Sequence, residues 1–258
     1  MSDVRLRARS TTEIVDAAFT LYRQQPLTYM MAAAIGNVPY LVGAFIVQSG
    51  AESASLATSA VGGLMMFVSL VVYGLMSAVV MHIGSRAYLG EAGDLGTALQ
   101  DVLPKAGSLI AAGIARNILL GFGLILFVVP FFWVFARYFA VVPAITLENL
   151  GQPGSFRRSV ALSDGRKGHI LATMALVWVI YFVVAAGLGG VIGVALGGSQ
   201  VISTLVSTLI TIAIYPVLAL TEMVLYYDSR IRAEGFDLDH MTQALGRGGA
   251  TLDPTRPA

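Results

Sequence analysis

Cysteine is absent from the 258 residues, and charged side chains are scarce. Without cysteine the chain has no disulfides and no thiolate chemistry, and its composition says nothing about the redox compartment. Asp, Glu, Lys and Arg make up 12% of the residues, whereas a soluble domain has about 25%. The net charge of +1 gives no reason to expect a nucleic-acid partner. Hydrophobic residues reach 56%, with a mean hydropathy of +0.76, and this excess predicts an integral membrane protein.

Sequence signatures of enzymes are missing as well. The three histidines, His82, His169 and His240, have no metal-ligand spacing with another His or a carboxylate. There is no HExxH, no GxSxG and no P-loop, and the glycine-rich run at 187–190 lacks the spacing of a dinucleotide loop. We therefore expect no catalytic residues, no bound metal and no cofactor. The polar N-terminus lacks the apolar segment of a cleaved signal peptide.

Long apolar runs are what the sequence has in abundance. A bilayer core of about 30 Å needs about 20 helical residues to cross it. The run at 107–147 is long enough for two crossings, and Pro130 near its middle can end one helix and let another begin. We predict an all-α protein with six transmembrane helices, at about 27–47, 57–83, 107–129, 131–148, 169–195 and 201–227.

The positions of the basic residues predict the orientation. With six spans, every Lys and Arg except Arg116 and Arg137 falls on one side of the membrane. Because short cytoplasmic loops are enriched in Lys and Arg, both termini are predicted to be cytoplasmic. Residues 1–242 would form one membrane domain, and the Gly- and Pro-containing segment 243–258 would be a disordered cytoplasmic tail.

Each pair of spans is preceded by a segment with near-helical spacing of apolar residues, at 10–25, 94–106 and 154–168. In the first of these, Ser10 and Glu13 can form a capping box. We predict three interfacial amphipathic helices on the cytoplasmic side, each followed by a transmembrane hairpin.

Small residues recur at helical spacing in the last two spans. In the fifth span they are Ala185, Gly189, Gly193 and Gly197, and in the sixth they are Ser203, Ser207 and Thr211. Such stripes let helices approach closely. The two spans are expected to pack on each other, and the alternative is that the glycine stripe forms a homodimer.

Four polar residues lie within the predicted spans: Arg116, Asn117, Arg137 and Glu222. An ionised side chain facing lipid costs about 2.5–3.5 kcal/mol or more, so these residues should face the protein interior. One interpretation is an internal network, in which Glu222 pairs with one arginine and the other bonds to carbonyls freed by prolines. A second starts from the imbalance of two cations and one anion, which the phosphate or carboxylate of a bound lipid headgroup would complete. A transport relay is the third.

Four stretches resemble a known family: STTEIVDAAFTLYRQQP at 10–26, VVPFFWVFARYFAVVPAITLEN at 128–149, SFRRSVALSDGRKGHIL at 155–171 and LYYDSRIRAEGFDL at 225–238. They resemble bacterial proteins grouped with the membrane domain of glycerophosphoryl diester phosphodiesterases. In that family the phosphodiesterase chemistry belongs to a separate soluble barrel domain, for which this chain has no room. The resemblance therefore implies a bacterial cytoplasmic (inner) membrane protein without that activity. In the family a proline opens the fourth span and an arginine follows it, as Pro130 and Arg137 do here, which implies a structural or functional role for Arg137.

These observations lead to one functional hypothesis and one alternative, while a third, a membrane enzyme, is disfavoured because the sequence has no catalytic constellation. The first is a non-enzymatic polytopic inner-membrane protein that binds or translocates an anionic lipid or amphiphile, with Arg116 and Arg137 on the headgroup and Asn117 and Glu222 orienting it. The alternative is a structural or assembly subunit of a larger membrane complex. The expected partners are membrane lipids with anionic headgroups, a second copy of the chain or other membrane subunits, and no nucleic acid.

Overall fold

The computed structural model describes residues 7–52, 55–195 and 200–235, in which all regular structure is helical. The elements are α1 (Thr11–Gln24), α2 (Pro26–Glu52), α3 (Leu56–Tyr88), α4 (Leu95–Val102), the 3₁₀ helix η1 (Leu103–Lys105), α5 (Ala106–Leu126), α6 (Val128–Arg137), α7 (Val141–Glu148), α8 (Gln152–Ser163), α9 (Lys167–Ala195) and α10 (Gln200–Glu234). The predicted tail 243–258 lies outside the described residues.

Six helical stretches in this part of the chain are long and apolar enough to cross a membrane. They are Pro26–Ala51, Leu56–Tyr88, Leu95–Leu126, Val128–Glu148, Lys167–Ile192 and Gln200–Glu234. The prediction of an all-helical chain with six long apolar helices is confirmed. The fold is therefore compatible with a polytopic membrane protein.

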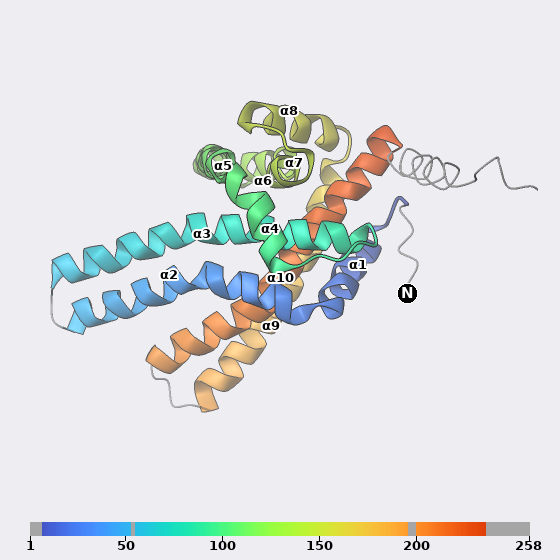
Figure 1. The fold of residues 1–258 in the computed structure, drawn as a ribbon. Coiled ribbons are helices and arrows are strands. Elements are labelled where there is room, and N and C mark those ends of the chain that lie inside the picture. Colours follow the sequence, from blue (N-terminus) through green and yellow to red (C-terminus); the bar gives the residue numbers. More distant parts are fainter. Residues whose placement is uncertain (1–6, 53–54, 196–199, 236–258) are drawn as a thin grey trace, which may run out of the picture.

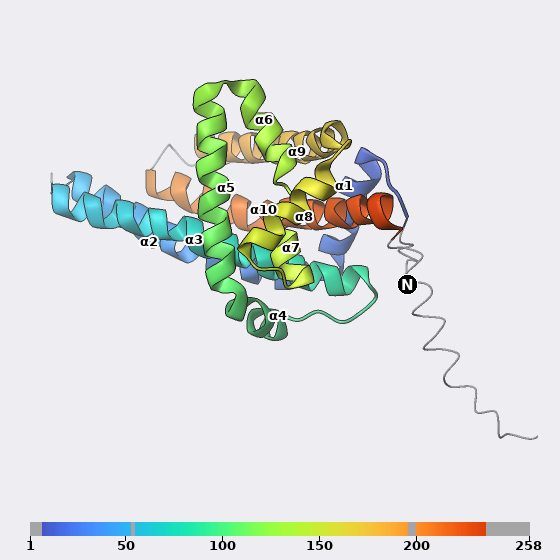
Figure 2. The ribbon, with the colours of Figure 1, turned by 90° about the horizontal axis from the view of Figure 1, so that it is seen from above.

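The helices do not all run side by side. The α2–α3 pair and the far ends of α9 and α10 extend away from the rest of the molecule (Figure 1), while α5 crosses over α3 and α10 (Figure 2). The N-terminal helix α1 and the last turns of α10 lie at the opposite end, together with α8. We call α1, α8 and the last turns of α10 together the charged end, because most of the ion pairs are found there.

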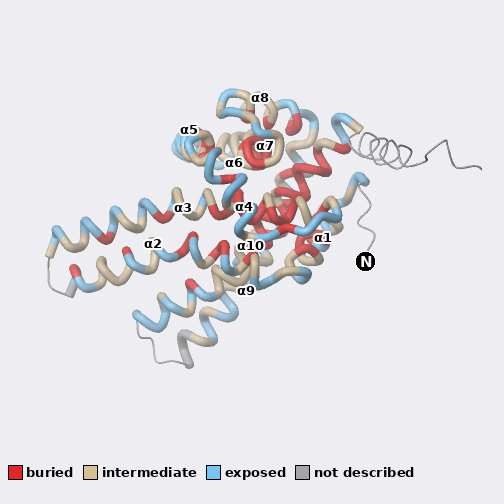
Figure 3. Tube along the Cα trace, in the orientation of Figure 1, coloured by how far each residue is buried: buried red, intermediate tan, exposed pale blue. Residues whose placement is uncertain are grey.

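Burial is uneven along the long helices. The buried side chains concentrate where α1, the second half of α3, α7 and the second half of α10 meet (Figure 3). Away from that core, large apolar side chains remain exposed, including Leu64, Phe67, Phe182 and Val183. Exposed apolar surface on this scale is typical of a protein that contacts lipid or another subunit.

The three short helices occur close to the segments predicted for them. In α1, Ser10 accepts a hydrogen bond from the Glu13 amide and Glu13 accepts one from the Ser10 amide, which confirms the capping box. Hydrogen bonds from Arg7 and from Ser10 lower the pKa of Glu13 to about 2. The apolar face of α1, with Ile14 and Ala18 fully buried, packs against the protein. Contact of these helices with the membrane surface stays a prediction.

The α2–α3 pair packs through a glycine stripe that the sequence analysis missed. Gly36, Gly43 and Gly50 occupy every seventh position of α2, and therefore one face of it. A Cβ atom added to Gly43 would lie 2.7 Å from the Gly62 carbonyl oxygen, and one added to Gly62 would lie 2.7 Å from the Gly43 carbonyl oxygen. The two backbones are thus in direct contact, which only glycine permits.

The boundary between the third and fourth predicted spans differs from the prediction. We expected the third span to reach residue 129 and the turn to lie near Pro130, but α5 ends at Leu126 and Phe127 is extended. Pro130 instead lies in the first turn of α6. Proline is tolerated there because the amides of the first turn have no partner within the helix, so it marks the new helix rather than the turn.

The fourth predicted span, 131–148, is not one continuous helix. It divides into α6 and α7, separated by Tyr138–Ala140. Ser159 of α8 spans this break: its hydroxyl donates to the Arg137 carbonyl at 2.9 Å and accepts from the Ala140 amide at 3.0 Å. Backbone groups left unpaired by the break are thus satisfied by a buried serine from another helix.

Candidate functional site

A cavity of about 630 Å³ lies where α5 crosses α3 and α10, with Val142 of α7 also in its wall. Most of its lining is apolar. The polar side chains in the wall are Tyr73, Ser77, Arg116, Asn117, Tyr215 and Glu222. This mixture, a largely apolar wall with a few polar groups, is typical of small-molecule and lipid sites.

Arg116 and Glu222 form an incomplete ion pair in this cavity. Arg116 Nη1 lies 3.8 Å from Glu222 Oε1, and each side chain is 15% exposed. That distance is too long for a hydrogen bond. Within the described residues, Arg116 Nε and Glu222 Oε1 are buried without a hydrogen-bond partner. Buried charges are stabilised when further hydrogen bonds complete the pair, so this pair leaves donor and acceptor capacity for a ligand.

One aromatic ring contacts Arg116, and two more line the cavity. The Arg116 guanidinium carbon lies 5.7 Å from the centre of the Phe135 ring. Tyr73 of α3 and Tyr215 of α10 face each other, with ring centres 4.0 Å apart. The cavity wall therefore contains a cation, an anion and two tyrosine rings.

The structure brings together three of the four polar residues singled out in the sequence. Arg116, Asn117 and Glu222 line the same cavity, whereas Arg137 does not line it. The Arg137 guanidinium carbon lies over the Trp133 ring, 4.8 Å from its centre. Its backbone carbonyl is bound by Ser159, as described above. Arg137 lies two positions after Phe135, which contacts Arg116, and this offset turns the arginine to a different side of α6.

The predicted small-residue stripes are partly at the α9–α10 contact. Gly189 approaches Ile210, and the Tyr181 hydroxyl lies 3.5 Å from the Thr211 hydroxyl. Ser203 and Ser207 are exposed. Ala185 is half-buried, while the surroundings of Gly193 and all of Gly197 lie outside what the structure describes.

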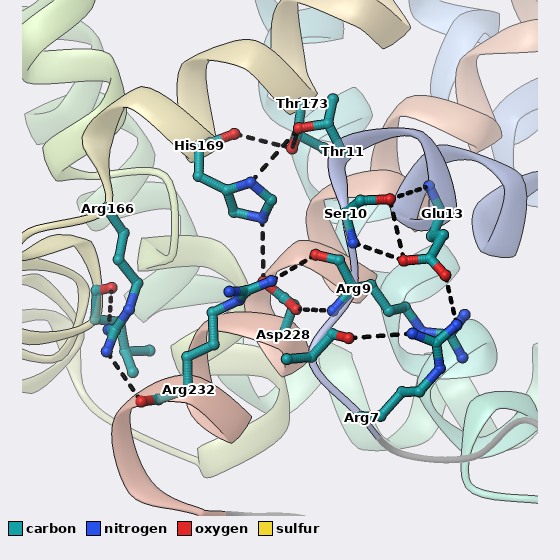
Figure 4. A network of polar contacts seen from close by, with 12 residues as sticks. Arg7, Arg9, Ser10, Thr11, Glu13, Arg166, His169, Thr173, Asp228 and Arg232 are labelled. Carbon is teal, nitrogen blue, oxygen red and sulfur yellow. Dashed lines mark hydrogen bonds and ion pairs between the residues drawn. The ribbon is translucent and has the colours of Figure 1, made fainter.

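A second polar cluster, centred on Asp228, fastens the N-terminal segment to the charged end (Figure 4). Asp228 accepts from the Arg9 amide at 2.7 Å and from Arg232 Nε at 2.8 Å, and His169 Nε2 lies 3.2 Å from its carboxylate. The Asp228 side chain is 1% exposed. The pairing of Asp228 with Arg232 follows from their spacing on one helix, but Arg9 and His169 are too distant in the sequence to be predicted.

An ionic network lies beside this cluster and connects three helices. Arg158 of α8 contacts Glu148 at the end of α7 and Glu234 at the end of α10, and Arg230 contacts both carboxylates. The hydrogen bond to Glu234 contributes most to raising the pKa of Arg158. These contacts hold α7 and α8 against α10, and so help to fix the wall of the cavity.

Comparisons with known proteins add no identification. No family model, no curated protein and no solved structure matches the chain. The resemblance to the membrane domain of glycerophosphoryl diester phosphodiesterases stays a prediction. Among the described residues, no group of three or more His, Asp or Glu side chains is placed to hold a metal ion.

Proposed function

We propose that this protein is a non-enzymatic, multi-pass protein of a bacterial cytoplasmic membrane that binds or translocates an amphiphile with an anionic headgroup. The incomplete Arg116–Glu222 pair in a cavity of about 630 Å³ is the observation that carries the proposal. Arg116 would contact the anionic group, and Asn117 and Glu222 would orient the headgroup. Arg137, which lies outside the cavity lining, would stabilise α6 through Trp133.

The chemistry of the cavity supports this choice of ligand. Ligand sites usually measure about 300–1,000 Å³, so the cavity has room for a headgroup and the first part of its acyl chains. A guanidinium binds phosphate or carboxylate with forked donors. The exposed apolar side chains in the cavity wall, such as Phe67 and Ile118, would contact the hydrocarbon of the ligand or of the bilayer.

The topology is proposed from the same basic residues that the sequence analysis used. Arg9, Arg158, Arg166 and Arg232 lie at the charged end, which we assign to the cytoplasm. The hairpins would be formed by α2–α3, by α5 with α6 and α7, and by α9–α10. Helices α1, α4 and α8 would lie at the cytoplasmic interface.

One observation favours the alternative, a structural or assembly subunit. On α5, a Cβ atom added to Gly113 or Gly121 would meet nothing within 4 Å. Together with the exposed Asn117 between them, these residues leave a face on which another helix can pack, over the side of the cavity that Gly113 and Asn117 line. In that case protein subunits rather than lipid should accompany the purified protein.

We expect Arg116→Gln to abolish retention of a stoichiometric amphiphile while the protein stays folded. Glutamine keeps hydrogen-bonding capacity but removes the charge and the forked geometry on which the bound anion depends. The measurement is native mass spectrometry of protein extracted gently from its own membrane. A circular dichroism spectrum of each variant checks the fold.

Arg137→Gln is the matched control, because it removes an arginine from the neighbouring helix but outside the cavity. It should retain the amphiphile that Arg116→Gln loses. If both variants lose it, Arg137 takes part in binding, as the sequence analysis predicted. If neither wild type nor variants carry an amphiphile and other subunits co-purify, the alternative replaces the proposal.

A further inference from the structure

The charges that line the cavity cancel. Arg116 and Glu222 are the charged side chains in its wall, and the other polar members are two tyrosines, a serine and an asparagine. In a low-dielectric site, adding a ligand with net charge leaves one charge without a counter-charge, which is costly. A ligand that carries one positive and one negative group leaves the site neutral and can satisfy both side chains.

We propose that the amphiphile is a zwitterionic phospholipid with a protonated amine in its headgroup, such as phosphatidylethanolamine. This inference rests on the proposed function, in which Arg116 binds the anionic group of the ligand, and adds that the same headgroup carries a balancing cation. The phosphate would accept from Arg116, including Nε, and the ammonium would donate to Glu222 Oε1, so that the two buried atoms without partners are both satisfied. The 3.8 Å between Arg116 and Glu222 lets each side chain turn from its neighbour to the ligand.

The tyrosine pair supports an ammonium rather than a second anion. Tyr73 and Tyr215 both line the cavity and place two aromatic rings next to each other. The faces of aromatic rings attract cations and disfavour anions. A phosphate therefore has Arg116 as its partner, while an ammonium has the Glu222 carboxylate and two tyrosine rings in the same wall.

The shape of the wall indicates a lipid rather than a soluble zwitterion. Along α3 the lining changes from polar at Ser77 and Tyr73 to apolar at Leu70 and Phe67. Ten residues of helix correspond to about 15 Å, a distance comparable with much of an acyl chain. Leu70 and Phe67 are exposed, so the cavity opens along the apolar surface on which acyl chains would lie.

The experiment offers purified protein equal amounts of phosphatidylethanolamine and phosphatidylglycerol with the same acyl chains, in detergent micelles. Native mass spectrometry then gives the ratio of the two lipids bound at one copy per protein. We expect wild type to favour phosphatidylethanolamine at least tenfold. Glu222→Gln makes the lining net positive, so we expect it to reverse the preference toward phosphatidylglycerol.

Two further variants keep the result interpretable. Glu91→Gln removes the same charge from an exposed position outside the cavity and should leave the ratio unchanged. Asn117→Asp adds a negative charge to the lining with little change in size. It should lower phosphatidylglycerol binding below the level of wild type. This variant tests the charge argument even if Glu222→Gln does not fold.

The outcomes separate this inference from the proposed function. A wild type that prefers phosphatidylglycerol, or a ratio that neither Glu222→Gln nor Asn117→Asp changes, overturns the zwitterion assignment while leaving lipid binding intact. A wild type that retains neither lipid at one copy per protein, or an Arg116→Gln variant that retains as much as wild type, overturns the proposed function itself.

Discussion

Replacing Gly62 by alanine should separate α2 from α3 and destabilise the protein by roughly 2–3 kcal/mol or more. The added methyl group would lie 2.6 Å from the Val47 amide nitrogen and 2.7 Å from the Gly43 carbonyl oxygen. Both are backbone atoms, which cannot move aside as a flexible side chain can. Since much of this helix pair extends away from the rest of the molecule (Figure 1), other helices cannot compensate there for the lost contact.

Gly63→Ala is the matched control, because it makes the same change at the next position of the same helix. An added Cβ at Gly63 meets nothing within 4 Å. Alanine favours helix over glycine by about 1 kcal/mol, so this variant should be as stable as wild type or slightly more stable. Thermal unfolding in detergent, followed by circular dichroism, measures both. Equal stability of the two alanine variants would contradict the close backbone packing.

The second large effect is expected at the Asp228 cluster. Asp228→Asn should destabilise the protein by about 3 kcal/mol, because removing one partner of a buried ionic cluster leaves the others desolvated and unpaired. Asparagine keeps only one of the two acceptor oxygens, so either the Arg9 amide or Arg232 Nε would face an NH2 donor instead of an acceptor. Limited proteolysis should cut the N-terminal segment before α1 more readily, since the Arg9 amide loses its carboxylate.

Asp164→Asn serves as the comparison for Asp228→Asn. The Asp164 side chain is 89% exposed and lies 3.9 Å from Lys167. Exposed ion pairs contribute about 0–1 kcal/mol, so neither the unfolding temperature nor the proteolysis of the N-terminal segment should change appreciably. If Asp164→Asn destabilises the protein as much as Asp228→Asn, the buried cluster has no special role.

The features that the sequence predicted are those set by local periodicity. Apolar runs of sufficient length determined the six long helices, and the spacing of Ser10 and Glu13 determined the cap of α1. The glycine stripe of α2 could also have been found, because Gly36, Gly43 and Gly50 recur every seven residues. Its seven-residue spacing differs from the four-residue spacing of the stripes predicted in the fifth and sixth spans.

The features that the sequence did not predict depend on contacts between distant segments. Ser159 satisfies the backbone at the break after Arg137, and nothing near that break in the sequence indicates it. The crossing of α5 over α3 and α10 likewise depends on packing (Figure 2). For the candidate site, hydrophobicity singled out Arg116, Asn117, Arg137 and Glu222, but only the packing shows that Arg116, Asn117 and Glu222 share a cavity.

Crosslinking with a photoactivatable phospholipid tests the central claim most directly. The probe is a phosphatidylethanolamine with a diazirine in one acyl chain, added to wild-type protein in bilayers and mapped by peptide mass spectrometry. We expect crosslinks to concentrate in residues 67–77 and 109–118, which line the cavity, and Arg116→Gln to reduce them there. Crosslinks that spread evenly over exposed apolar positions such as Val179 and Phe182, with no effect of Arg116→Gln, would contradict a lipid site in this cavity.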